Sequence, residues 1–276
     1  MKKKMITLII SAILFVALFF GTFGNGNATE EKIQVQMVTF GDSVFGEIRD
    51  ETAIPALLGQ LTGKTVFNSA LGGTCVARAE DNRRLDAVAG SISLSELVRS
   101  IYAEDFGVQQ STYYRDSMME YFPEVIDGLE TVDFKQVEIV LIQHGVNDYH
   151  AGVPIENPED PYDEYSFLGA LRYCVETLRE VNPDIRIVLV TPAYTWYPFT
   201  GLTCETMDAG GGVLEDYVNA EIAFAEEMGI EVIDLYHDFL THVNYDDYIF
   251  YTRDGLHPNE EGRKLWAEKI ARELAR

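Results

Sequence analysis

The chain has 276 residues, with 45 acidic against 21 basic side chains, and its formal net charge is −24 at pH 7. Such a surface repels nucleic acid and anionic lipid at long range, so no nucleic-acid partner is expected. Only three cysteines are present, which excludes a small disulfide-stapled scaffold and allows at most one internal bridge.

The first 28 residues have the three parts of a secretory signal peptide. Three lysines at positions 2–4 precede an apolar run from Met5 to Phe20 and a small, polar stretch that ends at Ala28. The alternative is an uncleaved membrane anchor, because a run of about 16 to 20 apolar residues is at the lower limit for a spanning helix. We therefore expect a secreted or cell-surface protein whose residues 29–276 form a single domain, with membrane contact only if the segment stays uncleaved.

Beyond this segment, short β-type runs alternate with longer helical patterns. Strands are expected at 33–40, 64–68, 137–142, 185–191 and 231–235. Three of them are nearly continuous aliphatic runs, as in strands that are buried on both faces of a parallel sheet. Apolar spacing predicts helices over 165–181, over 212–228 and from 259 onwards. This alternation is typical of one α/β domain with right-handed crossovers.

Two segments depart from the alternation. Residues 75–134 separate two predicted strands by far more than one crossover requires, and we expect an insertion with two further helices there. Residues 152–164 are rich in Pro, Asp, Glu and Asn, which predicts a long surface loop. The acidic residues of this loop lack the alternating spacing of a calcium site, and no metal or other cofactor is expected.

A serine follows the first predicted strand in the tripeptide Gly41-Asp42-Ser43. It stands at the carboxyl end of a strand, where open α/β sheets bind ligands and where the next helix aims its N–H groups. A serine becomes a nucleophile when a neighbouring base removes its proton. Read alone, the tripeptide is more typical of a helix N-cap.

A candidate base lies in the segment Asp254-Gly255-Leu256-His257-Pro258. The spacing allows a turn in which Asp254 meets one ring nitrogen of His257 while the other nitrogen faces a pocket. A serine nucleophile requires this combination of base and orienting carboxylate. The alternative is a helix-entry turn in which His257 is simply a surface residue.

Two further loops offer hydrogen-bond donors. Asn147 follows the strand expected at 137–142, and the pair Gly72-Gly73 follows the strand expected at 64–68. A glycine lets its backbone N–H approach a ligand closely. Together with the N–H of Ser43, these groups could hold a negatively charged oxygen, and the loss of one such donor costs about 3 to 4 kcal/mol of transition-state stabilisation. Taken singly, each is better explained as an ordinary turn asparagine or loop glycine.

In this order, the four elements resemble the SGNH, or GDSL, hydrolase family. The matching positions are Gly41-Asp42-Ser43, Gly73 five residues after Asn68, Gly145 to Asp148 as Gly-x-Asn-Asp, and Asp254 to Pro258 as Asp-x-x-His-Pro. The resemblance implies that Ser43 is the nucleophile, His257 its base and Asp254 the orienting carboxylate. The sequence departs from the family pattern at Val44, where a leucine is frequent, and in the length of the insertion at 75–134, which leaves the shape of the substrate pocket open.

The resemblance also implies an oxyanion hole and a fold. The hole would consist of Asn147 and the N–H groups of Ser43 and Gly73, with Gly72 as the alternative if the glycine pair is shifted by one. The fold would have three layers, α/β/α, with a five-stranded parallel sheet of flavodoxin-like strand order.

The expected function is therefore hydrolysis of a carboxylic ester through an acyl-enzyme, without a metal. An exported enzyme of this kind would act on short acyl groups, such as acetyl, on carbohydrate or cell-wall polymers. Candidate substrate-binding residues flank the motifs: Asp42, Thr74, Asp148 and Trp196. The last belongs to an aromatic stretch, 194–199, which could stack on sugar rings or could equally pack as a lid.

Two other functions stay open. A lipase or lysophospholipase would have an apolar acyl channel lined by the insertion. A cell-surface binding protein would keep the fold without activity, although the intact motif residues argue against it. The expected partner is a small-molecule or polysaccharide ester substrate. The sequence does not indicate an oligomeric state.

Overall fold

The computed structural model of the protein describes residues 32–78, 91–115, 118–237, 239–240, 242 and 245–276. The segment predicted to be a signal peptide or anchor, residues 1–28, lies outside this range. Among the described residues, no helix combines the length and the apolar character that a membrane crossing requires.

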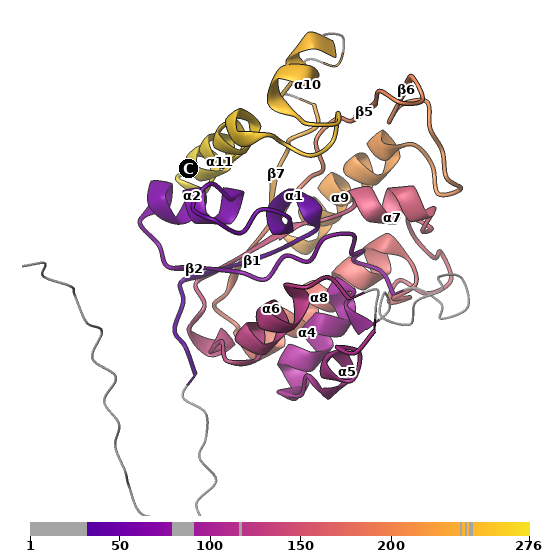
Figure 1. The fold of residues 1–276 in the computed structure, drawn as a ribbon. Helices are drawn as coiled ribbons and strands as arrows, with labels where there is room; N and C mark the ends of the chain where they lie inside the picture. Colours follow the sequence, from indigo (N-terminus) through magenta and orange to yellow (C-terminus); the bar gives the residue numbers. More distant parts are fainter. Residues whose placement is uncertain (1–31, 79–90, 116–117, 238, 241, 243–244) are drawn as a thin grey trace, which may run out of the picture. The chain divides into compact units, whose positions relative to one another are not determined.

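A five-stranded parallel sheet forms the centre of the domain (Figure 1). Its strands, in chain order, are β1 (Met37–Gly41), β2 (Val66–Asn68), β3 (Ile139–Gln143), β4 (Arg186–Val190) and β7 (Glu231–Ile233). They are arranged as β2-β1-β3-β4-β7, with every neighbouring pair parallel. The predicted α/β class and flavodoxin-like order are therefore confirmed.

The strand order creates a switch point between β1 and β3. The chain leaves β1 for β2 at one edge of the sheet and then returns to β3 on the other side of β1. Ligands of open α/β sheets bind at the carboxyl ends of the strands at such a point, because the loops there part in opposite directions. The segments that follow β1 and β3 begin with Asp42 and His144, at the two motifs found in the sequence.

Helices cover both faces of the sheet. On one face lie α2 (Ile54–Thr62) and α11 (Glu260–Leu274), which pack against each other, together with the short α1 (Ser43–Gly46). On the other lie α4 (Leu94–Ala103), α6 (Phe122–Glu130), α8 (Phe167–Val181) and α9 (Leu214–Met228). Successive strand residues point to opposite faces. Met37 thus belongs to the first core and Val38 to the second, which explains why the strands are apolar without interruption.

The inserted region holds three helices among its described residues, α4, α5 (Gly107–Gln110) and α6, rather than the two predicted. A 3₁₀ turn, Phe134–Gln136, leads into β3. The predicted loop at 152–164 contains no helix or strand. It follows α7 (Val146–Ala151).

The short elements that were not expected from the sequence include a pair of strands and a helix after β4. Strands β5 (Trp196–Tyr197) and β6 (Leu202–Thr203) form an antiparallel pair, and α10 (Tyr245–Tyr251) precedes the Asp254–Pro258 turn. All three lie near the carboxyl edge of the sheet, where they border the candidate site.

Candidate active site

Ser43 is the first residue of α1, directly after β1. The side chain of Asp42 caps this helix by accepting a hydrogen bond from the N–H of Val44 at 2.8 Å. Asp42 itself is completely buried. An N-cap of this kind fixes the path of the chain at the helix entrance, and so fixes the position from which the Ser43 hydroxyl points out of the sheet edge.

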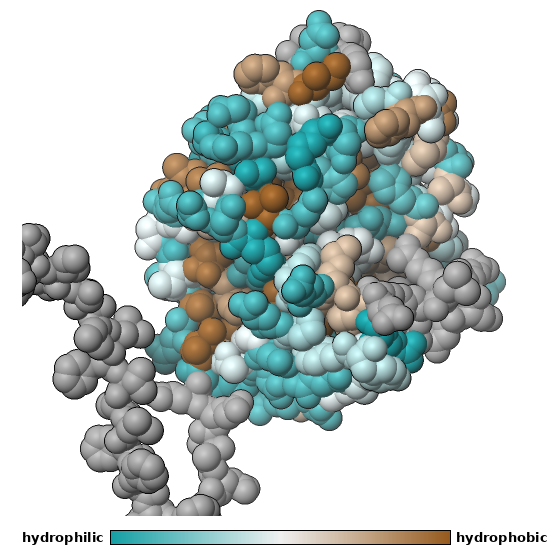
Figure 2. Space-filling view, in the orientation of Figure 1, coloured by the Kyte–Doolittle hydropathy of each residue, from teal (hydrophilic) through white to brown (hydrophobic). Residues whose placement is uncertain are grey.

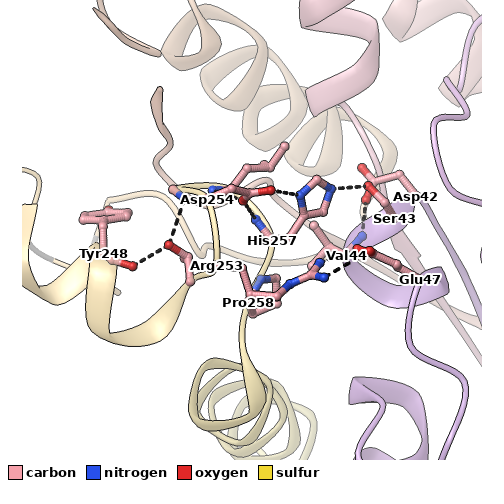
Figure 3. Close-up of polar contacts among 12 residues, drawn as sticks. Asp42, Ser43, Val44, Glu47, Tyr248, Arg253, Asp254, His257 and Pro258 are labelled. Atoms are coloured by element: carbon pink, nitrogen blue, oxygen red, sulfur yellow. Dashed lines mark hydrogen bonds and ion pairs between the residues drawn. The ribbon is translucent and has the colours of Figure 1, made fainter. Parts of the chain in front are cut away.

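The side chains of Ser43, His257 and Asp254 form a continuous hydrogen-bonded row (Figure 3). Oγ of Ser43 lies 2.9 Å from Nε2 of His257, although the two residues are 214 positions apart in the chain. Nδ1 of His257 lies 2.7 Å from Oδ2 of Asp254. These distances are within the hydrogen-bond range that a nucleophile and its base need.

Asp254 is held as an anion. Burial raises its pKa, but hydrogen bonds from the His257 ring and from the N–H groups of His257 and Leu256 outweigh burial and leave the pKa below its usual value. A carboxylate at Nδ1 keeps the imidazole proton on that nitrogen, so the lone pair of Nε2 faces Ser43. The row therefore has the polarity that proton removal from a serine requires.

The turn that carries Asp254 and His257 depends on Gly255. Its φ of +88° lies in the left-handed region, and a Cβ at this position would come within 2.2 Å of the Trp196 carbonyl oxygen. The N–H of Trp196 donates to the carbonyl of Gly255 at 3.1 Å. Strand β5 thus packs directly on the turn, and position 255 has no room for a residue with a side chain.

The loop after β2 approaches Ser43 from the opposite edge of the sheet. The N–H of Gly72 donates to Oη of Tyr121 at 2.8 Å and is therefore engaged. Gly73 has a φ of +78°, and open space surrounds the position where its Cβ would be. The structure thus favours Gly73 over Gly72 as the backbone donor of this pair.

Asn147 lies in the first turn of α7, and its Nδ2 donates to the carbonyl of Thr74 at 3.1 Å. This amide carries two hydrogens, and one of them is used in this contact. The contact fixes Asn147 beside the loop of Gly73. Asn147, Gly73 and Ser43 thereby occupy the loops after β3, β2 and β1 respectively, as the sequence predicted.

The buried side chains of His144 and Asp148 also bind the loop that follows β2. Asp148 accepts hydrogen bonds from the N–H groups of Val76 and Ala77, each at 3.0 Å. His144 is hydrogen-bonded to the backbone of Thr74, while burial lowers its pKa to about 3. The imidazole of His144 is therefore neutral and takes no part in charge balance at the site.

Three of the residues that were predicted to bind substrate, Asp42, Thr74 and Asp148, have buried side chains. Asp42 and Asp148 bind backbone N–H groups, and the hydroxyl of Thr74 donates to the carbonyl of Leu71. The fourth candidate, Trp196, is half-buried, with its ring beside Tyr194 and Tyr248. Its main contact with the site is the backbone contact with Gly255.

Two contributors to the site were missed in the sequence. Tyr121 comes from the insertion, in which no motif marks it. Arg253 is adjacent to the Asp254 motif, but its partner Glu47 lies 206 residues earlier. Contacts between such distant positions have no local signal in a single sequence.

A groove of about 290 Å³ borders the turn at Asp254 and Gly255. Its other walls are formed by Pro198, Phe199, Ile249, Thr252 and Arg253. The ring of Phe199 is 98% exposed, and hydrophobic side chains of α10 also reach the surface (Figure 2). In the part of the chain that the structure describes, no cluster of three or more His, Cys, Asp or Glu side chains could bind a metal ion.

Comparison with known proteins places the chain in a family. The model of the GDSL-like Lipase/Acylhydrolase family matches residues 38–265. A search of curated proteins found no significant match. Three similar solved structures show the same fold at low identity.

The first is a protein described as a possible lipase from Chitinophaga pinensis, which is 18% identical, with a TM-score of 0.58, over 88% of this chain and 99% of that one. A protein from Lactobacillus plantarum is 17% identical, with a TM-score of 0.59, over 88% and 98%. Est24, a carbohydrate acetylesterase from Sinorhizobium meliloti, is 16% identical, with a TM-score of 0.50, over 87% and 97%. With most of its length matched by the family model, the chain belongs to the GDSL-like lipase/acylhydrolase family and is a hydrolase of ester bonds.

Proposed function

We propose that this protein is an exported serine esterase that removes short acyl groups, acetyl above all, from carbohydrate or cell-wall polymers. The observation that carries the proposal is the row of Ser43, His257 and Asp254 at the switch point of the sheet, with distances of 2.9 and 2.7 Å. Ser43 is the nucleophile, His257 the base and Asp254 the carboxylate that orients it.

The reaction proceeds in two halves. Nε2 of His257 takes the proton of the Ser43 hydroxyl as Oγ attacks the ester carbonyl, and His257 then gives this proton to the departing alcohol. Water next attacks the acyl-enzyme and loses its proton to His257, which gives this proton to Oγ of Ser43 as the bond between Oγ and the acyl carbon breaks and the acid is released. In both halves the oxyanion accepts hydrogen bonds from the N–H groups of Ser43 and Gly73 and from the Asn147 amide.

The alcohol part of the ester lies on the side of His257, because the leaving oxygen must reach Nε2 to receive its proton. The groove beside Asp254 and Gly255 is on this side, and the exposed Phe199 ring at its rim offers a flat apolar face for a sugar ring. The similar fold of Est24, which is a carbohydrate acetylesterase, is consistent with this assignment. A lipase remains the alternative, and the same groove would then take a lipid glycerol.

A fluorophosphonate probe tests the nucleophile. It should label the wild type at Ser43, as located by peptide mass spectrometry, and should leave Ser43→Ala unlabelled. A catalytically silent binding protein would not react. Hydrolysis of p-nitrophenyl acetate and p-nitrophenyl decanoate then separates the two enzymatic alternatives, because an acetylesterase should prefer the first and a lipase the second.

Export is tested separately. The N-terminus of the protein recovered from the culture medium or cell envelope of an expressing bacterium should begin at residue 29 if residues 1–28 are a cleaved signal. An intact N-terminus in the membrane fraction would instead identify an anchor.

A further inference from the structure

The insertion reaches the reaction centre through Tyr121 and Met119. Oη of Tyr121 accepts the hydrogen bond from the N–H of Gly72, and the guanidinium of Arg49 lies 5.1 Å from the centre of the Tyr121 ring. Arg49 also donates to the carbonyls of Asn68 and Ala70 in the loop after β2. Tyr121 is thus tied to this loop at two points and forms a fixed wall.

The space between this wall and the nucleophile is narrow. A methyl group placed on Gly72 would lie 3.5 Å from Cβ of Ser43, 3.1 Å from Oη of Tyr121 and 3.6 Å from Sδ of Met119. The distances to Ser43 and Met119 are ordinary van der Waals separations, whereas 3.1 Å from Oη of Tyr121 is tighter than most such contacts and requires a small shift of that side chain. A group the size of a methyl therefore fills the space beside Gly72, and a longer acyl chain would have to displace the side chain of Met119.

The acyl group of a bound ester points toward this space. The leaving alcohol faces His257, and the oxyanion faces Gly73 and Asn147, so the alkyl part of the acyl group takes the remaining direction. β1 lies between β2 and the other strands. The loop after β2 meets Ser43 from the β2 side of β1, where Gly72 lies beside Cβ of Ser43, so an acyl chain on Oγ would lie beside Gly72.

We infer that Met119 and Tyr121 of the insertion close the acyl side of the site at the size of a methyl group, which restricts the enzyme to acetyl esters. This inference rests on the proposed function. It assigns a role to the insertion, which limits the length of the acyl chain, whereas the groove beside Asp254 binds the alcohol part of the ester.

Two substitutions test the inference from opposite directions. Met119→Ala widens the space, and the ratio of kcat/KM for p-nitrophenyl butyrate to that for p-nitrophenyl acetate should rise about tenfold or more, the effect of one or two methylenes in an apolar pocket. Gly72→Ala fills the space, and kcat/KM for the acetate should fall by about tenfold or more. Gly72, unlike Gly73, is outside the left-handed region, so its backbone accepts alanine.

Tyr114→Ala is the control, since Tyr114 lies in the same insertion with 79% of its surface exposed and should leave the ratio and both rates unchanged. Melting temperatures show that each variant is folded. An unchanged butyrate-to-acetate ratio in Met119→Ala, or wild-type acetate hydrolysis by Gly72→Ala, overturns the inference while the esterase function stands. A wild type without Ser43-dependent hydrolysis of any ester overturns both.

Discussion

Glu47 and Arg253 form a two-point ion pair that joins the end of α1 to the turn carrying Asp254 and His257. The hydrogen bond from Arg253 lowers the pKa of Glu47 below its usual value, and the same contact raises the pKa of Arg253. The nucleophile sits at the start of α1 and the base on the turn. The ion pair therefore links the helix that carries the nucleophile to the turn that carries the base.

Glu47→Gln should lower kcat by about three- to tenfold, because a loosened turn holds Nε2 less accurately against Ser43. Both side chains of the pair are more than two-fifths exposed, so the melting temperature should change by no more than about 2 °C. Glu261→Gln, which weakens an exposed ion pair with Lys264 on α11, is the matched control and should affect neither quantity. An unchanged kcat in Glu47→Gln would show that the turn is fixed by Gly255 and β5 alone.

Ser43→Ala should abolish esterase activity and keep the melting temperature within about 2 °C of the wild type. The hydroxyl is partly exposed, and its removal leaves no buried cavity. Loss of a triad member costs several orders of magnitude in kcat. More than roughly a tenth of wild-type activity in this variant would require another nucleophile.

Asn147→Ala should lower kcat by about a hundredfold or more and change KM little, because the amide acts on charge that develops in the transition state. The contact with the Thr74 carbonyl is also lost, but Asp148 and His144 continue to hold the same loop. Circular dichroism and the melting temperature check that the loop remains folded. A kcat equal to that of the wild type would reduce Asn147 to a structural role.

Asp42 should make the stability depend on pH. Burial raises its pKa to about 7, against the lowering effect of the hydrogen bond from Val44 and of nearby His257, and Asp148 raises it further. Between about pH 4 and pH 7 the folded protein holds this proton and the unfolded chain does not, so the free energy of unfolding falls as pH rises through this window.

Asp42→Asn keeps the cap and removes the titration. Between pH 4.5 and pH 7.5, its free energy of unfolding should fall by about 2 to 4 kcal/mol less than that of the wild type, as measured by urea denaturation. Glu51→Gln, on the surface, gives the reference for a carboxylate in solvent. Parallel pH dependences in wild type and Asp42→Asn would contradict the protonated, buried state of Asp42.

The sheet was predictable from the sequence because its strands are buried on both faces. Runs such as 137–142 are apolar at every position or nearly so, which is typical of strands covered on both faces. The pair β5 and β6 has two residues in each strand, too few for any periodicity, and α10 has only seven residues, which is too short for a clear helical pattern. Both elements form because the surrounding loops support them.

The site, too, was predictable from the sequence only in part. The order and spacing of the motifs predicted that Ser43, Asn147 and His257 lie at the carboxyl edge of the sheet, and they lie there in the structure. Asp148 is buried because adjacent residues on a helix point about 100° apart, so a neighbour of Asn147 faces the interior instead of the cleft. Tyr121 could not be found, since the fold alone brings the insertion to Gly72.

The separation of 214 residues between Ser43 and His257 has a consequence for how activity arises. A chain folded only as far as β4 contains the serine and the oxyanion loops but neither Asp254 nor His257, so it lacks the base that activates the serine. Hydrolysis begins only when β7 has joined the sheet and α11 has docked against α2. Return of activity during refolding therefore reports that both ends of the chain have come together, whereas return of helical ellipticity reports only that the helices have formed.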